Sequence, residues 1–176
     1  HTDRLGHAAA QNESLPDIDR HPLLVLANWR RQCFDCALIT IVHIDGKSPR
    51  DAGAAMVVRQ DGAAHGYVTG GCLERELALV GQQAIASREA RTLRYGKGSP
   101  FIDIRLPCGA GLDVHVDPNI TDETVFKAEE LLLSRQPFLL SISKIGPAQI
   151  ERESAENAGH LNWTDHARIS VQQNPP

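Results

Sequence analysis

The chain has 176 residues, which is enough for one domain with a substantial hydrophobic core. Hydrophobic residues make up 41% of it, and the net charge of -4 is spread along the sequence, which argues against a nucleic-acid-binding role. Neither a signal-peptide pattern nor an apolar run of about 20 residues is present, so we expect a cytoplasmic protein that is not inserted in a membrane. Four cysteines are few for a disulfide scaffold of this size, so we expect reduced thiols.

Strands outnumber helices in the predicted secondary structure. Residues 1–20 are polar and lack periodicity, which predicts a flexible N-terminal extension. An amphipathic helix is expected at 21–32, followed by a buried strand at 36–44 and by hairpin strands at 54–59 and 63–69 around Asp61-Gly62. A helix from Cys72 onward then precedes strands at 92–95, 102–106 and 112–116. The last elements are a helix from Thr121 to about Ser134, a strand at 138–143 and a strand pair within 149–173. This order predicts an α+β fold, with one mixed β-sheet, a hairpin and two to three packed helices in a single domain over 21–150, followed by a C-terminal segment and linker-like tail at 151–176.

The most informative motif is Gly70-Gly71-Cys72, where the hairpin ends and a helix begins. A helix N-terminus presents unpaired N–H groups at the positive end of the helix dipole, and glycines let an anion approach them. A cysteine at that position also ionises more easily. The motif therefore predicts either an anion cradle with an activated thiol, or a tight turn with a small buried Cys72. Glu74 and Glu76, in the first helical turn, would repel an anionic ligand.

A second cysteine, Cys108, lies in the segment Pro107-Cys108-Gly109-Ala110-Gly111. Glycines around one residue indicate a close backbone approach or a positive φ, although an ordinary turn is the more common explanation of the pattern when it is taken by itself. Together, Cys72 and Cys108 could provide two thiolates for one soft ligand atom.

Two cations, Lys47 and Arg50, follow the buried strand at 36–44. Arg50 could hold a phosphate through its bidentate guanidinium and Lys47 through a point charge, or both could be solvated residues of a turn. A second loop at 95–100, with the sequence Tyr-Gly-Lys-Gly-Ser-Pro, resembles a backbone nest for an anion.

Two further patterns suggest metal or redox chemistry only weakly. Cys33 and Cys36 form a CxxC pair, but no second pair completes a zinc site and the motif ends a predicted helix, so we expect two buried thiols. Asp113, His115 and Asp117 alternate with apolar residues and share one face of a strand. A solvated face is a more common explanation of that pattern than a hard-metal site, so we predict no metal site.

In these residues the chain resembles the N-terminal domain of the xanthine dehydrogenase accessory proteins, the XdhC/CoxI family. The matching blocks occur in the family's order within residues 36–118, and they are Gly46-Lys47-Ser48-Pro49-Arg50 with Gly53-Ala54, the hairpin turn Asp61-Gly62, Gly70-Gly71-Cys72-Leu73-Glu74, and Leu106-Pro107-Cys108-Gly109-Ala110-Gly111 with Pro118. The chain differs from the family's usual Cys-Gly-Gly at Ala110. Family members usually continue into a Rossmann domain, which we expect to be absent from these residues.

The resemblance implies a maturation factor for molybdenum hydroxylases of the xanthine or CO dehydrogenase type. Such a protein binds the molybdenum cofactor, protects it while a cysteine desulfurase supplies the sulfido ligand, and delivers it to the apo-enzyme. The cofactor-binding residues would be Cys72 and Cys108 as soft contacts, Gly70, Gly71 and Gly109 as anion-binding backbone, and Lys47 and Arg50 as phosphate ligands. The cofactor role favours a chaperone over a turnover enzyme.

Two alternatives remain open at the level of sequence. One is a thiol-dependent sulfurtransferase or oxidoreductase with Cys72 as the nucleophile, which requires a depressed thiol pKa. The other is a module that binds no ligand and forms a homodimer or docks an apo-dehydrogenase. Such a docking surface would not require the paired Gly-Cys motifs.

Overall fold

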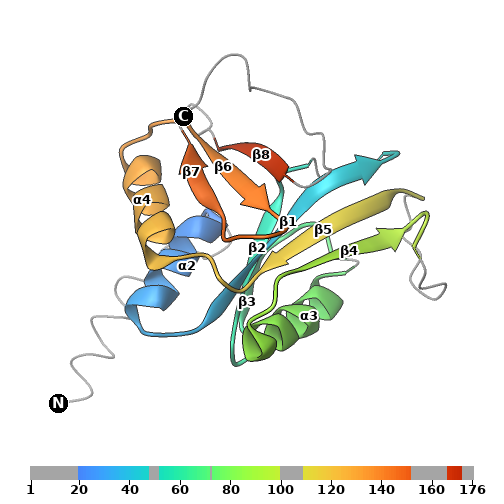
Figure 1. The fold of residues 1–176 in the computed structure, drawn as a ribbon, viewed down its shortest axis with the longest axis horizontal. Coiled ribbons are helices and arrows are strands. Elements are labelled where there is room, and N and C mark those ends of the chain that lie inside the picture. The colour runs from blue at the N-terminus through green and yellow to red at the C-terminus, as the bar shows by residue number, and fades with distance from the viewer. Residues whose placement is uncertain (1–19, 48–51, 72, 100–108, 152–165, 172–176) are drawn as a thin grey trace.

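The structure is a computed structural model, and it describes residues 20–47, 52–71, 73–99, 109–151 and 166–171. The described part contains three helices and two sheets, as Figure 1 shows. The helices are α2 (Pro22–Arg31), α3 (Glu74–Ser87) and α4 (Asp122–Leu133). The longest of them, α3, has 14 residues, so no described helix is long enough to cross a membrane.

The larger sheet has five strands in the order β3-β2-β1-β5-β4. Their bounds are β1 (Cys36–Asp45), β2 (Ala55–Arg59), β3 (Ala64–Gly66), β4 (Arg91–Gly96) and β5 (Gly111–Asp117). The smaller sheet has the order β7-β6-β8, formed by β6 (Phe138–Ser143), β7 (Gln149–Glu151) and β8 (His166–Val171). Every described strand pair is antiparallel.

The central strand β1 is buried on both faces because a different layer covers each of them. Ala37, Ile39 and Ile41 belong to a cluster that includes the apolar face of α3. Leu38 and Val42 alternate with them and belong to the cluster formed with α2, α4 and the smaller sheet. This arrangement explains the continuous β-branched run of β1, since a strand covered on both sides has no polar face.

Local signals account for the ends of several elements. Thr121 caps α4, where its hydroxyl accepts a hydrogen bond from the Thr124 N–H at 3.2 Å, as its position before two acidic residues predicts. The hairpin turn forms around Asp61, whose carboxylate accepts hydrogen bonds from the Arg59 guanidinium and the Ala63 N–H. Gly62 adopts a φ of +96°, which only glycine tolerates without strain.

The α+β class, the single domain and the helices are confirmed, but the arrangement of the strands differs from the prediction. The predicted single mixed sheet is in fact two antiparallel sheets. The two strands within 149–173 exist as β7 and β8, but they do not pair with each other because both pair with β6. The predicted strand at 102–106 and all but the last residue of the predicted extension at 1–20 lie outside the described residues.

Candidate functional site

Two of the three predicted site loops meet at one end of the larger sheet. β1 and β4 end there and β5 begins there, with Gly111 opposite both Asp45 and Gly96 (Figure 1, right of the view). A Cβ atom on Gly46 would lie 3.5 Å from the Cα of Ala110, so the loops that contain Lys47 and Gly109 are in contact.

A shared apolar cluster connects the glycine turn before α3 with β4 and β5. β3 is antiparallel to β2, and β2 is antiparallel to β1, so β3 runs in the same direction as β1, although it ends at Gly66, level with Ile39 of β1. Leu73, which precedes α3, packs in one apolar cluster with Tyr95 of β4 and Leu112 of β5. Burial and then the nearby charge of Glu76 raise the pKa of Tyr95 to about 12.

The structure thus brings Lys47 and Gly109 together, whereas Gly70 and Gly71 lie in the turn before α3, whose Leu73 belongs to the same apolar cluster as Tyr95 and Leu112. The other predicted site residues, which are Arg50, Cys72 and Cys108, lie outside the described residues. The three glycines have φ values of +73°, +119° and +72°, and a Cβ atom on any of them would meet nothing within 4 Å. They therefore serve the backbone conformation of open loops rather than close packing.

Ala110, which replaces the second glycine of the family's Cys-Gly-Gly, fits the loop without strain. Its φ is not positive, and its side chain is buried at 1% exposure. The replacement therefore does not require a conformation that alanine tolerates poorly.

The carboxylate of Glu74 fills the glycine turn from within the chain. Its Oε1 accepts hydrogen bonds from the N–H groups of Val68 at 3.1 Å and Thr69 at 2.8 Å. Its Oε2 accepts from the N–H groups of Gly71 at 3.0 Å and Leu73 at 3.1 Å. The Thr69 hydroxyl lies 2.9 and 2.8 Å from the two oxygens, and it also accepts a hydrogen bond from the Leu73 N–H.

This network gives the Gly71 N–H a hydrogen-bond acceptor within the chain. That N–H donates to Glu74 and is not available to an external anion, so the glycine turn is capped internally. The sequence showed that Glu74 opposes an anion, but not that its side chain folds back onto its own turn. Burial alone would raise the pKa of Glu74, but the hydrogen bonds from Thr69 and Val68 outweigh it and the pKa is lowered.

Cationic side chains surround the start of β5 at this end. The guanidinium of Arg94 donates from Nε to the Asp113 carboxylate at 2.9 Å and from Nη1 to the Lys97 carbonyl at 3.2 Å. The ammonium of Lys97 lies 4.0 Å from the carboxylate of Asp45, the last residue of β1. Sequence analysis identified the Lys97 loop but missed its position across the start of β5 from Lys47, because that position depends on the strand register.

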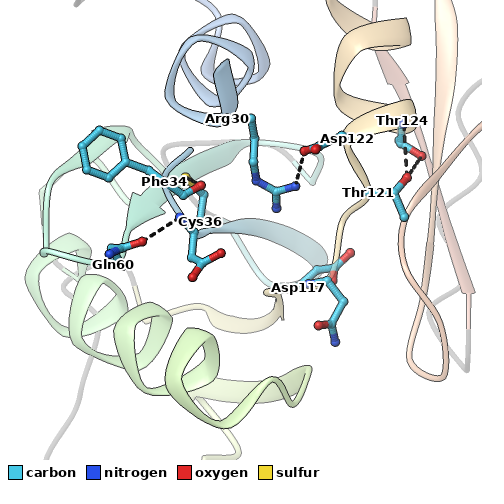
Figure 2. Close-up of polar contacts among 10 residues, drawn as sticks. Arg30, Phe34, Cys36, Gln60, Asp117, Thr121, Asp122 and Thr124 are labelled. Atoms are coloured by element: carbon cyan, nitrogen blue, oxygen red, sulfur yellow. Dashed lines mark hydrogen bonds and ion pairs between the residues drawn. The ribbon is translucent and has the colours of Figure 1, made fainter. Parts of the chain in front are cut away.

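The opposite end of the sheet contains a second polar cluster around Arg30, Cys36 and Asp117 (Figure 2). Arg30 donates to the Asp122 carboxylate at 2.9 Å, and its positive charge acts on both the thiol of Cys36 and the carboxylate of Asp117. Burial nevertheless dominates, raising the pKa of Cys36 to about 11 and raising that of Asp117. Asp117 accepts hydrogen bonds from the Asn119 N–H at 2.7 Å and the Ala148 N–H at 3.0 Å, so it links β5 to the segment before β7.

Two predictions about these residues are wrong. Cys33 is exposed and only Cys36 of the CxxC pair is buried. The predicted solvated face of β5 is covered by the smaller sheet, with His115 and Asp117 each 2% exposed. Its three polar residues have separate partners, and among the described residues no group of three His, Cys, Asp or Glu could hold a metal ion.

A cavity of about 820 Å³ lies between α4 and the β6–β7 part of the smaller sheet. None of the predicted site residues lines it. The cavity and the predicted site residues therefore lie in different parts of the fold. We place the candidate site at the end of the larger sheet, where the loops of Lys47 and Gly109 are in contact.

Comparison with known proteins confirms the family resemblance. Residues 29–96 match the model of the XdhC and CoxI family, a span that contains Lys47, Arg50, Gly70, Gly71 and Cys72 but not Cys108. Over residues 29–96 the chain is therefore similar to this family in sequence. Gly109 and Cys108 rest on the sequence motif alone.

A particular relative is the molybdenum cofactor insertion chaperone PaoD of Escherichia coli strain K12, which is 48% identical over 75 residues. The match covers 43% of this chain and 24% of that protein, so the chain spans about a quarter of the relative's length. A crystal structure described as a xanthine dehydrogenase from Bacillus halodurans has a TM-score of 0.57 and 22% identity, over 69% of this chain and 38% of that chain. This likeness confirms the fold.

Proposed function

We propose that this chain is a maturation factor that binds the molybdenum cofactor and acts as a chaperone for a molybdenum hydroxylase in the cytoplasm. The observation that carries the proposal is the meeting of the loops at one sheet end, in a chain that matches a molybdenum cofactor insertion chaperone at 48% identity. An apo molybdenum hydroxylase of the xanthine or CO dehydrogenase type would be the recipient, and a cysteine desulfurase would be the sulfur donor. A homodimer would be the assembled form.

The predicted site residues fit the chemistry of that cofactor. Cys72 and Cys108 would be the soft contacts to its metal centre, since thiolates prefer soft metals. Lys47 and Arg50 would hold its phosphate, and the backbone at Gly70 and Gly109 would approach it closely because these glycines face open space. Gly71 would act indirectly, since its N–H helps Glu74 to hold the turn beside Cys72.

The chaperone role requires binding and release but no bond-breaking step by the chain itself. The cofactor supplies a dithiolene-bound molybdenum and a phosphate when bound. The chain supplies thiol groups, cations and a turn that Glu74 holds in one conformation before the ligand arrives. A preformed turn reduces the entropy lost on binding.

Anaerobic equilibrium binding of isolated molybdenum cofactor tests the proposal. Wild-type chain should bind it stoichiometrically, and the double variant Cys72→Ser/Cys108→Ser should lose binding while keeping its circular dichroism spectrum and melting temperature. Cys33→Ser is the matched control, because Cys33 is exposed at the opposite end of the sheet, and it should bind like wild type. Cofactor retention by the double variant would refute the proposed contacts, and absence of binding by wild type would refute the function of this chain.

A further inference from the structure

Lys97 occupies a position that mirrors Lys47 across the first residues of β5. Gly46, next to Lys47, approaches Ala110 from the β1 side. The Lys97 N–H donates to the Ala110 carbonyl at 3.1 Å from the β4 side. Neighbouring strands lie about 4.8 Å apart, so the backbones of the two lysines are about two strand spacings, roughly 10 Å, from each other. Gly109, which leads into β5, lies between them.

The turn that carries Lys97 is held in a defined conformation. Gly96 and Gly98 adopt φ values of +76° and +80°, and the Ser99 N–H donates to the Gly96 carbonyl at 3.0 Å. The Lys97 carbonyl accepts a hydrogen bond from Arg94 at 3.2 Å. The backbone is therefore fixed at this turn, whereas the ammonium group at the end of the Lys97 side chain is free to change its partner.

The only recorded contact of the Lys97 ammonium among the described residues is a weak one. It lies 4.0 Å from the Asp45 carboxylate, and the Lys97 side chain is 67% exposed. An exposed ion pair of this length contributes little, so a phosphate group can displace the carboxylate at small cost. Arg94 is different, since Asp113 and the Lys97 carbonyl already engage its guanidinium.

The capped glycine turn strengthens the case for a cationic site at Lys97. Glu74 uses the N–H groups of Val68, Thr69, Gly71 and Leu73, so these groups cannot serve a ligand phosphate. The carboxylates of Glu74 and Glu76 also make that side of the site negative. An anionic group of the ligand is thus favoured on the other side, where Lys47 follows the end of β1 at Asp45 and Lys97 follows the end of β4 at Gly96, and where the carboxylates of Asp45 and Asp113 are already paired with Arg94 or Lys97.

We infer that Lys97 is a further residue of the ligand site, where it binds the phosphate group of the cofactor together with Lys47. Asp45 holds the ammonium group until the ligand arrives. This inference rests on the proposed function, and it specifies which described residues bind the anionic part of the ligand.

A comparison of two ligands and three variants tests the inference. The ligands are isolated molybdenum cofactor and the same cofactor after phosphatase treatment, and binding is measured anaerobically. The variants are Lys97→Gln, Lys97→Arg and the control Lys127→Gln. Lys127 is also an exposed lysine paired with a carboxylate, at 3.3 Å from Glu130, but it lies on α4 outside the site. Melting temperatures establish that each variant is folded.

Lys97→Gln should weaken binding of the intact cofactor by about tenfold, the usual size of one charge-assisted hydrogen bond, and should leave binding of the phosphatase-treated form unchanged. Lys97→Arg should restore most of the affinity, and Lys127→Gln should behave like wild type. Equal weakening of both ligands by Lys97→Gln, or no weakening of either, would overturn the inference while leaving the chaperone function intact. If wild type binds neither ligand, the proposed function fails and the inference fails with it.

Discussion

Glu74→Gln is the substitution that most directly tests the capped glycine turn. Glutamine keeps one acceptor oxygen and replaces the other with an NH₂ group. Whichever way the amide is oriented, its NH₂ faces two backbone N–H groups, either those of Val68 and Thr69 or those of Gly71 and Leu73. Two hydrogen bonds to a charged acceptor are lost, each worth about 1.5–3 kcal/mol. Because water can reach the half-buried side chain, we expect a total loss near the lower limit, about 2–3 kcal/mol of unfolding free energy.

Glu76→Gln is the matched control for this prediction. Glu76 lies in the same helical turn and carries the same charge, but its side chain is exposed. Its removal should cost only the helix-dipole interaction, about 0.3–1 kcal/mol. Urea unfolding followed by circular dichroism measures both values. If Glu74→Gln costs no more than Glu76→Gln, the hydrogen-bond network does not stabilise the fold and the argument is refuted.

The pH dependence of Glu74 provides a second test of the same network. The pKa of Glu74 is lowered in the folded state from its ordinary value of 4.5, so the unfolded chain binds the proton more readily. The stabilisation is therefore complete above about pH 4.5 and decreases as the pH falls further. In the Glu74→Gln variant, this part of the acid destabilisation should be absent.

Three further predictions concern other parts of the chain. Burial and then the charge of Lys144 lower the pKa of His115 to about 4. The contribution of His115 to the unfolding free energy should therefore be complete above pH 6.5 and decrease by about 3 kcal/mol between pH 6.5 and 4. Urea titrations of His115→Gln should show a shallower decline of the unfolding free energy over that pH range. Gly81→Ala should destabilise the protein by about 1–2 kcal/mol, because the added Cβ would lie 3.0 Å from the Cβ of Val58. This cost should outweigh the higher helix propensity of alanine, so an increase in melting temperature would contradict the prediction. Iodoacetamide should modify Cys33 in the folded protein but Cys36 only after unfolding, as mass spectrometry of the digested chain can establish; equal rates would contradict the burial of Cys36.

Local sequence signals determined much of the secondary structure. The cap at Thr121, the turn at Asp61-Gly62 and the glycines before α3 act within a few residues, so their structural effect can be read from the sequence itself. The run that forms β1 also predicts burial, because no charged residue interrupts it before its end. These features depend on contacts between residues that are close in the sequence.

The strand arrangement could not be predicted from local patterns. Alternation on β5 shows that Asp113, His115 and Asp117 share a face, but it cannot show whether that face meets water or another layer. The smaller sheet covers it, and the Ala148 N–H, 31 residues away, supplies a hydrogen bond to Asp117. Only the packing of distant segments decides whether such a polar face is solvated or buried.

The candidate site shows the same division between sequence and tertiary structure. The sequence determined which residues have suitable chemistry, since glycines, cysteines and cations stand in recognisable blocks. Tertiary structure decided which of them meet: strand register places Lys97 beside Ala110, and the fold of one turn directs Glu74 onto the N–H groups that the motif left open. Backbone hydrogen bonds must be satisfied within the folded chain, and a side chain held nearby satisfies them before any ligand does.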